Sequence, residues 1–156
     1  MAITSFRYKY AFLSNFSPAI IQAAGIVYPT VEHFYQAMKT EDVECHKIIA
    51  ALSHPAEAKK FGKGKQKLYG RKVVLRPDWE QLRVPFMAAG LQAKFQYPNL
   101  RYYLLLTGNE LLVEGNVWHD NFWGDCSCPD CWNKPGLNNL GRLLMATRTV
   151  FQQEKS

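Results

Sequence analysis

The residues best suited to chemistry lie between Val117 and Asp125, where two tryptophans, one histidine and two aspartates fall within nine positions. This segment shows neither a helix nor a strand period, so we expect a loop. A carboxylate such as Asp120 can stabilise the oxocarbenium-like state that forms when a sugar C–N or C–O bond breaks. The faces of Trp118 and Trp123 can hold a planar base by stacking, which contributes ~1–3 kcal/mol per base. The segment therefore suits a nucleoside-like substrate, although the same residues could equally cap a hydrophobic core.

A further carboxylate, Glu32, begins a predicted helix. Thr30 is a good N-cap for a helix that runs to about Thr40. Glu32 then lies in the first turn, where the helix dipole favours an ionised carboxylate over a protonated acid. Such a group suits stabilisation of a positive charge. Its alternative role is ordinary first-turn stabilisation of the helix, worth about 0.3–1 kcal/mol.

The elements that must position these residues are mainly helices. Helical patterns cover residues 30–40, 42–52, 55–61, 79–95 and 100–106, and another helix opens at residue 136. Pro85 should kink or split the helix over 79–95. The last helix should bury one face, which comprises Leu137, Leu140, Leu143, Leu144, Thr147, Val150 and Phe151. Short strands are expected at 25–28, at 111–114 and within 3–16. We predict a compact, predominantly helical α+β fold with a small sheet, as a single domain over residues 1–156.

The composition is that of a soluble globular protein, with 47% hydrophobic and 21% charged residues. No apolar run approaches the ~20 residues of a membrane span, and the first residues lack the form of a signal peptide. We therefore expect a cytoplasmic protein with no membrane partner. The net charge of +6 favours an anionic partner, and eight of the eighteen residues 59–76 are Lys or Arg. A phosphorylated small molecule and a nucleic acid both fit, as does a solvated basic loop.

Three cysteines within six residues suggest a possible metal site. Cys126, Cys128 and Cys131 could bind structural zinc with His119 or Cys45 as the fourth ligand. Only the spacing of the last two cysteines is familiar in zinc sites, and a reduced surface loop fits the segment as well. A redox pair is disfavoured, because no thioredoxin-like βαβ pattern surrounds it. We therefore expect no metal in the active site and substoichiometric zinc in the purified protein.

Four segments distributed over nearly the whole chain form a recognisable set: FLSNF (12–16), YPTVEHFYQAMK (28–39), DNFWGD (120–125) and GLNNLGRLLM (136–145). In sequence and in order they resemble the signatures of the NADAR, or YbiA-like, family. The resemblance implies the mainly helical YbiA-like fold and an N-glycosidase that hydrolyses a ribose–nitrogen bond without a cofactor. Family substrates include phosphorylated ribosylamino-pyrimidine intermediates of riboflavin synthesis and, in other branches, ADP-ribose attached to guanine.

By matching position, the resemblance implies that Glu32 is the essential catalytic carboxylate and that Asp120 belongs to the pocket. Our hypothesis is that Asp120 assists proton movement or holds the ribose. The expected substrate-binding residues are Trp79, Trp123, Asn15, Lys39 and Lys63. The two tryptophans are expected to frame the base, and the two lysines are our inference for anion contacts. The chain departs from the bacterial YbiA pattern in its lysine-rich segment 63–76 and in the cysteine insertion after Asp125.

The leading hypothesis is therefore an N-glycosidase acting on a small phosphorylated ribosylamine. Two alternatives remain open. One is a hydrolase that removes ADP-ribose from guanine in nucleic acid, which the positive charge favours. The other is a non-catalytic module that binds ADP-ribose or another nucleotide.

Overall fold

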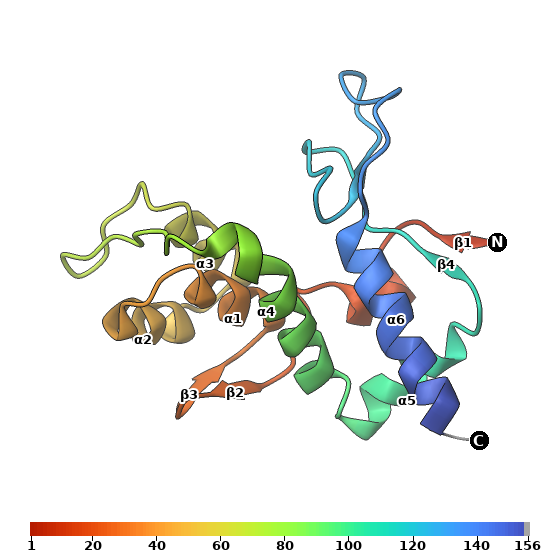
Figure 1. Cartoon of the computed structure of the whole chain (residues 1–156), viewed down its shortest axis with the longest axis horizontal. Helices are drawn as coiled ribbons and strands as arrows, with labels where there is room; N and C mark the ends of the chain where they lie inside the picture. The colour runs from red at the N-terminus through yellow and green to blue at the C-terminus, as the bar shows by residue number, and fades with distance from the viewer. Residues whose placement is uncertain (155–156) are drawn as a thin grey trace. The chain divides into compact units, whose positions relative to one another are not determined.

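The computed structural model describes residues 1–154, and the contacts within it divide the chain into two compact units (Figure 1). The central unit is the contiguous stretch Asn15–Lys94. The terminal unit combines Met1–Ser14 with the chain from Phe95 onward. The helix-rich α+β class predicted from the sequence is confirmed, since short two-stranded sheets accompany the helices in the described residues. The single domain expected over residues 1–156 stays a prediction.

The central unit is built around one short helix. Its elements are β2 (Ile21–Ala23), β3 (Ile26–Tyr28), α1 (Val31–Met38), α2 (Val43–Ala51), α3 (Pro55–Gly62) and α4 (Trp79–Lys94). Strands β2 and β3 form an antiparallel hairpin, in which Ile21 lies opposite Tyr28. Helix α1 packs against α2, α3 and α4. This surrounding cover buries every residue of α1 from Val31 to Ala37, including polar side chains that a two-sided helix would expose.

Helix α1 begins where the sequence predicts. Thr30 has an extended backbone, and its hydroxyl accepts a hydrogen bond from the backbone N–H of His33 at 3.1 Å. The imidazole of His33 is buried and lies 2.8 Å from the same hydroxyl and 3.0 Å from the carbonyl oxygen of Leu52. Burial lowers the pKa of His33, against the opposing effects of that carbonyl and of Glu57. A neutral histidine therefore ties the start of α1 to the end of α2.

The longest helix of the central unit is not split by its proline. Helix α4 runs without interruption from Trp79 to Lys94, with Pro85 inside it. Pro85 is exposed to solvent, so a carbonyl that loses its N–H partner to the proline can bond water instead. Helices α2 and α3 match their predicted ranges to within a residue at each end.

In the terminal unit, a short parallel strand pair joins the segment before residue 15 to the chain after residue 94. Its elements are β1 (Ala2–Ile3), the 3-10 helix η1 (Tyr8–Leu13), α5 (Pro98–Leu106), β4 (Leu111–Leu112), β5 (Gly115–Asn116), β6 (Asp125–Cys126) and α6 (Asn139–Glu154). Strand β1 pairs with β4 and β5 pairs with β6, both in parallel. Helix α6 packs against α5 and β4. None of the helices from Met1 to Glu154 is both long enough and apolar enough to cross a membrane.

The predicted buried face of the last helix was partly wrong. Helix α6 starts at Asn139 rather than residue 136, and Leu137 and Val150 are exposed. The buried stripe includes Arg148, whose guanidinium donates to the hydroxyl of Thr107 at 2.8 Å. Sequence spacing identifies the helix, but its rotation depends on the surface it packs against. Helix α5 likewise starts at Pro98 rather than residue 100, because proline suits the first helical turn.

Candidate functional site

The carboxylate of Glu32 is buried in the central unit and held in one direction. Only 7% of the surface of Glu32 is exposed to solvent. The Nε2 of Gln36, one helical turn later, donates to Glu32 Oε1 at 2.7 Å. The backbone N–H of Glu32 donates to the carbonyl oxygen of Asn15 at 3.1 Å. The two predicted site residues Glu32 and Asn15 are therefore joined. Gln36 was not among the predicted site residues, although its i,i+4 spacing from Glu32 could have indicated it.

Two amide oxygens close to Glu32 lack partners. Asn15 Oδ1 and Gln36 Oε1 are buried and accept no hydrogen bond from the described residues. The amide nitrogen of Asn15 faces the sulfur of Met87 at 3.3 Å, and that of Gln36 is used by Glu32. A buried acceptor without a donor costs about 1–3 kcal/mol. Both oxygens are therefore suited to a ligand that brings hydroxyl or amino hydrogens.

A glycine makes room for this arrangement. A Cβ added to Gly62, the last residue of α3, would overlap Oε1 of Gln36. A side chain at position 62 would therefore displace the amide of Gln36 from its present position beside Glu32. The contact of Gly62 with Gln36 could not be predicted from the sequence, because the two residues meet only when α1 packs on α3.

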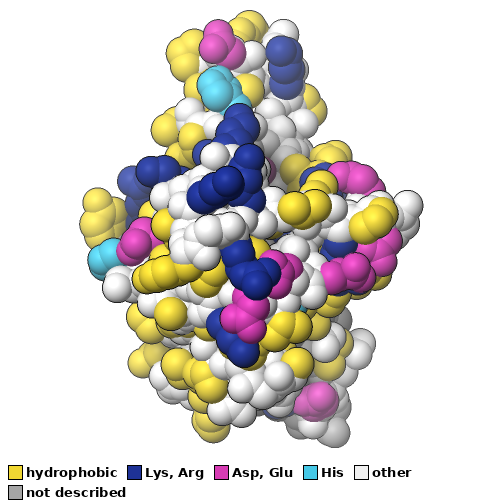
Figure 2. Space-filling view, turned by 90° about the vertical axis from the view of Figure 1, so that its left-hand side faces the viewer, with side chains coloured by type: hydrophobic (Ala, Val, Ile, Leu, Met, Phe, Trp, Pro, Cys, Tyr) yellow, Lys and Arg dark blue, Asp and Glu magenta, His cyan; other side chains and the backbone are white. Residues whose placement is uncertain are grey.

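The two lysines predicted to contact an anion, Lys39 and Lys63, belong to one group of positive charges. The pKa of Lys39 is lowered, and burial is the largest cause. Attraction to Glu32 raises this pKa, whereas repulsion from Lys59, Lys63 and Arg83 lowers it. Lys39 therefore lies within electrostatic range of the catalytic candidate and of three other cations. Figure 2 views the side of the molecule from which the 63–76 segment extends in Figure 1, and Lys and Arg side chains gather there among some acidic ones. The sequence analysis counted Lys59 in the basic segment 59–76 without assigning it to the site, and it did not single out Arg83.

Trp79 lies in the same unit as Glu32 but is packed in an aromatic cluster. Its ring centroid lies 5.2 Å from that of Tyr35 and 6.3 Å from that of Phe86, which it stacks against. Only 4% of Trp79 is exposed. The ammonium of Lys39 lies 5.7 Å from the Tyr35 ring and so joins the aromatic cluster to the basic group. The role of Trp79 in framing a base stays a prediction.

Asp120 lies in the terminal unit, in a loop organised by Asn116. The Oδ1 of Asp120 accepts hydrogen bonds from the backbone N–H groups of Phe122 and Trp123, at 3.2 and 2.9 Å. The buried Asn116 side chain accepts from the N–H groups of Trp118 and Asp120 and donates to the carbonyl oxygen of Asp120. The carboxylate of Asp120 thus shapes the turn before Trp123. Its part in proton transfer stays a prediction, and no pattern in the sequence pointed to Asn116.

The same loop caps helix α6. The carbonyl oxygens of Phe122 and Trp123 accept hydrogen bonds from the N–H groups of Asn139 and Leu140, at 3.2 and 3.0 Å. Asp125 Oδ1 accepts from the N–H of Gly136 at 2.9 Å. The first N–H groups of a helix have no partners within the helix, so these bonds hold loop and helix together. The structure therefore fixes Trp123 on a rigid support, while its contact with substrate stays a prediction.

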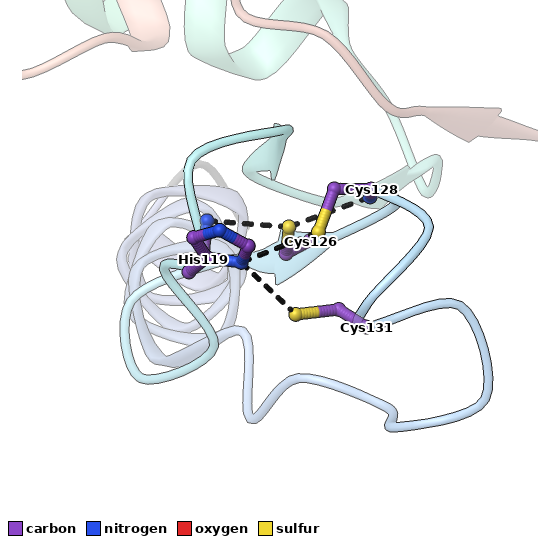
Figure 3. Close-up of side chains that lie close together, drawn as sticks. All are labelled: His119, Cys126, Cys128 and Cys131. Carbon is purple, nitrogen blue, oxygen red and sulfur yellow. Dashed lines mark hydrogen bonds between the residues drawn. The ribbon is translucent and has the colours of Figure 1, made fainter.

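A histidine and three cysteines come together at the outer part of this loop (Figure 3). We call these four residues the Cys3His cluster: His119, Cys126, Cys128 and Cys131. Their ligand atoms all lie within 4.8 Å of one another. The three thiols are free and buried, and His119 closes the cluster from the solvent side. Cys45, the other proposed fourth ligand, lies in the central unit, where its thiol donates to Asp42 and to the carbonyl oxygen of Lys72.

The hydrogen bonds within the cluster distinguish its sulfurs. The Nδ1 of His119 lies 3.2 Å from the sulfur of Cys128 and 3.5 Å from that of Cys131. The sulfur of Cys126 accepts from the backbone N–H groups of His119 and Cys128, at 3.3 and 3.5 Å. Burial favours the neutral Cys126 thiol, but these N–H groups and the neighbouring thiols outweigh burial and lower its pKa. Burial and the neighbouring sulfurs raise the pKa of Cys131 to about 11.

Comparisons with known proteins agree over almost the whole chain. The family model described as the NADAR domain matches residues 4–152. An N-glycosidase of Nostoc punctiforme is 38% identical over 154 residues, covering 94% of this chain and 91% of that protein. The chloroplastic riboflavin biosynthesis protein PYRR of Zea mays is 37% identical over 148 residues, covering 87% of this chain and 22% of that protein. The NMR structure of Escherichia coli YbiA has a TM-score of 0.78 and 34% identity, covering 99% of this chain and 89% of that one.

Proposed function

Because the chain belongs to the NADAR domain family, we propose that it is an N-glycosidase that hydrolyses the ribose C–N bond of a phosphorylated ribosylamino-pyrimidine. One relative is named an N-glycosidase, which supports the proposed reaction. Another is named a riboflavin biosynthesis protein, which supports the proposed class of substrate. The observation that carries it is the buried Glu32 carboxylate beside two buried amide oxygens that lack donors.

Glu32 serves the transition state. As the C–N bond breaks, its electron pair passes to the nitrogen and C1 of the ribose becomes cationic. A carboxylate at the start of α1, fixed by Gln36, can stabilise that charge without moving during the reaction. The oxygen of a water molecule then bonds to C1, and a proton from the water is transferred to the departing amine. The products are ribose 5-phosphate and a free amino-pyrimidine.

The surroundings of Glu32 suit the rest of such a substrate. The unpaired oxygens of Asn15 and Gln36 can accept hydrogen bonds from the ribose hydroxyls. Lys39, together with the nearby Lys63, can neutralise the 5-phosphate. Attraction to a phosphate also offsets the mutual repulsion among these cations. Asp120, Trp79 and Trp123 enter the proposal through the family resemblance, as a group that assists proton movement and as aromatic frames for the base.

The direct test is product release. Purified protein is incubated with each of the two phosphorylated ribosylamino-pyrimidine intermediates, and the formation of ribose 5-phosphate is followed with time. We expect multiple turnovers without an added cofactor. Absence of release from both compounds and from ADP-ribosylated guanine would reject an N-glycosidase. Calorimetric binding of ADP-ribose with no product formed over hours would instead identify a binding module.

The second candidate is removal of ADP-ribose from guanine in nucleic acid. Exposed lysines in the 63–76 segment, Lys63, Lys65 and Lys67, favour it because they can neutralise backbone phosphates. Turnover on modified DNA that falls steeply with salt, with none on the small intermediates, would support this candidate. Turnover confined to the small intermediates, with weak salt dependence, would remove it.

A further inference from the structure

We propose that the Cys3His cluster binds one zinc ion as a structural site, which fastens the loop that carries Asp120 and Trp123. The sequence suggested only a partial ligand set and therefore substoichiometric zinc. The structure changes that expectation, because the backbone brings a complete set of four ligand atoms into one group. The site is separate from Glu32 and does not depend on the substrate proposed above.

The spacing of the four atoms matches tetrahedral coordination. Zn–S bonds of about 2.3 Å and Zn–N bonds of about 2.0–2.1 Å place ligand sulfurs about 3.8 Å apart and place sulfur about 3.6 Å from nitrogen. In the protein, Nδ1 of His119 lies 3.2 and 3.5 Å from two of the sulfurs, and no pair in the cluster exceeds 4.8 Å. Figure 3 shows the sulfurs turned towards the imidazole. A zinc ion can therefore be accommodated by side-chain shifts of less than about 1 Å.

The type and number of ligands select zinc in a structural role. Thiolate sulfur and imidazole nitrogen are the ligands that zinc prefers in proteins. Four protein ligands fill a tetrahedral site and leave no position for a reactive water molecule. The two backbone N–H groups that donate to the Cys126 sulfur support this assignment, because a thiolate accepts such bonds better than a thiol does.

The backbone at His119 is compatible with this role. Its φ of 68° lies in the left-handed region, which histidine adopts more often than most residues with a side chain. Such a conformation persists where the surroundings over-determine it. A bond from Nδ1 to zinc would supply that constraint, since it would hold the ring against the buried sulfurs on the other side of the loop.

The ligands flank the segment that carries the candidate site residues. His119 directly precedes Asp120, and Cys126 ends β6, directly after Asp125. The N–H of Cys126 also donates to Oδ1 of Asn121 at 2.8 Å, inside that segment. One zinc ion would therefore close the loop across residues 119–126 and tie the following cysteines to it. Release of zinc should loosen Asp120 and Trp123 while leaving the central unit folded.

The experiment measures metal in protein produced with zinc and purified without chelators. We expect one zinc per chain in the wild type by elemental analysis. Cys128→Ser and Cys131→Ser should lose it. Cys45→Ser is the matched control, because it removes a buried thiol of the same chain outside the cluster and should keep the metal. His119→Ala should lose zinc, whereas His119→Cys should retain it, since it restores four ligands.

A spectroscopic measurement keeps the test decisive if a serine variant does not fold. Wild-type protein reconstituted with Co²⁺ should show the intense visible bands of a tetrahedral thiolate site. Native wild-type protein should also protect the three cluster thiols from a thiol reagent until a strong chelator is added. Folded wild-type protein that holds no zinc after incubation with excess zinc and desalting would overturn the proposal. Retention of zinc by both Cys128→Ser and Cys131→Ser would overturn it as well.

Discussion

Replacement of Glu32 by glutamine separates catalysis from folding. Glu32→Gln keeps the length of the side chain. In the wild type Nε2 of Gln36 lies 2.7 Å from Glu32 Oε1, and in the variant the new amide oxygen can still accept this hydrogen bond. The variant loses the attraction between a carboxylate and the N-terminus of α1, about 0.3–1 kcal/mol. It also loses the extra strength of a charge-assisted bond, but it no longer buries a charge at a site with 7% exposure. The opposing effects leave a net loss of stability of no more than ~1 kcal/mol.

The effect on turnover should be much larger. A preorganised group that stabilises transition-state charge contributes ~100-fold or more to the rate, about 2.7 kcal/mol. Because that charge forms mainly during the reaction, affinity for the substrate should change far less than kcat. The expected signature is a folded protein with near-normal substrate binding and turnover reduced by ~100-fold or more.

Three measurements decide the question: a thermal melt, a binding isotherm and the release of ribose 5-phosphate. Glu57→Gln is the matched control, since Glu57 also lies in the first turn of a helix of the central unit but is exposed. The control should retain full turnover. A folded Glu32→Gln protein with the turnover of the control would refute the assignment of Glu32 as the catalytic carboxylate.

Three further variants test the surroundings of Glu32 and the core of the central unit. Gly62→Ala should displace the Gln36 amide and lower kcat by about tenfold or more in protein that gives a native circular dichroism spectrum; unchanged kcat would contradict the positioning role. Lys39→Met should raise KM by about tenfold with a smaller effect on kcat, and an equal KM for phosphorylated and unphosphorylated substrate in the wild type would count against the phosphate contact. Burial lowers the pKa of Lys94 to about 7, whereas the unfolded chain titrates near 10.4. Between these pH values the unfolded state binds the extra proton, so the free energy of unfolding should rise with pH by up to about 1.4 kcal/mol per unit. Denaturant melts at pH 7 and 9 should show the rise in the wild type and a smaller one in Lys94→Met; parallel changes would exclude Lys94 as its source.

Local signals in the sequence predicted the start of the site helix but not its environment. The hydroxyl of Thr30 caps α1 as expected, because capping depends on residues three positions apart. Burial of the polar side of α1 depends on α2, α3 and α4, which the sequence pattern of α1 alone does not reveal. The prediction of the buried face of α6 was partly wrong for the same reason, since Arg148 is buried and its guanidinium donates to the hydroxyl of Thr107.

The sequence predicted which residues belong to the candidate site better than it predicted their contacts. Glu32 was singled out by its place in the first helical turn, and its catalytic role and the choice of Asn15 came from the family resemblance. The structure adds the bond between their backbones. Gln36 was within reach of sequence reasoning, through its i,i+4 spacing from Glu32. Gly62 was not, because its role depends on the close approach of two helices. The choice of His119 over Cys45 in the Cys3His cluster also required the fold, since both alternatives fitted the sequence.

The division of the chain has a consequence for the order in which the protein takes shape during synthesis. All segments of the central unit lie within Asn15–Lys94, so its contacts can form once that stretch has left the ribosome. Strand β1 precedes the central unit in the chain, yet Ala2 pairs with Leu111, which is made only after the central unit is complete. Proteolysis of stalled nascent chains would show protection of residues 15–94 before that of β1. Until β4 is made, Ala2 and Ile3 lack their partner strand, and their backbone N–H and C=O groups stay open to pairing with another chain.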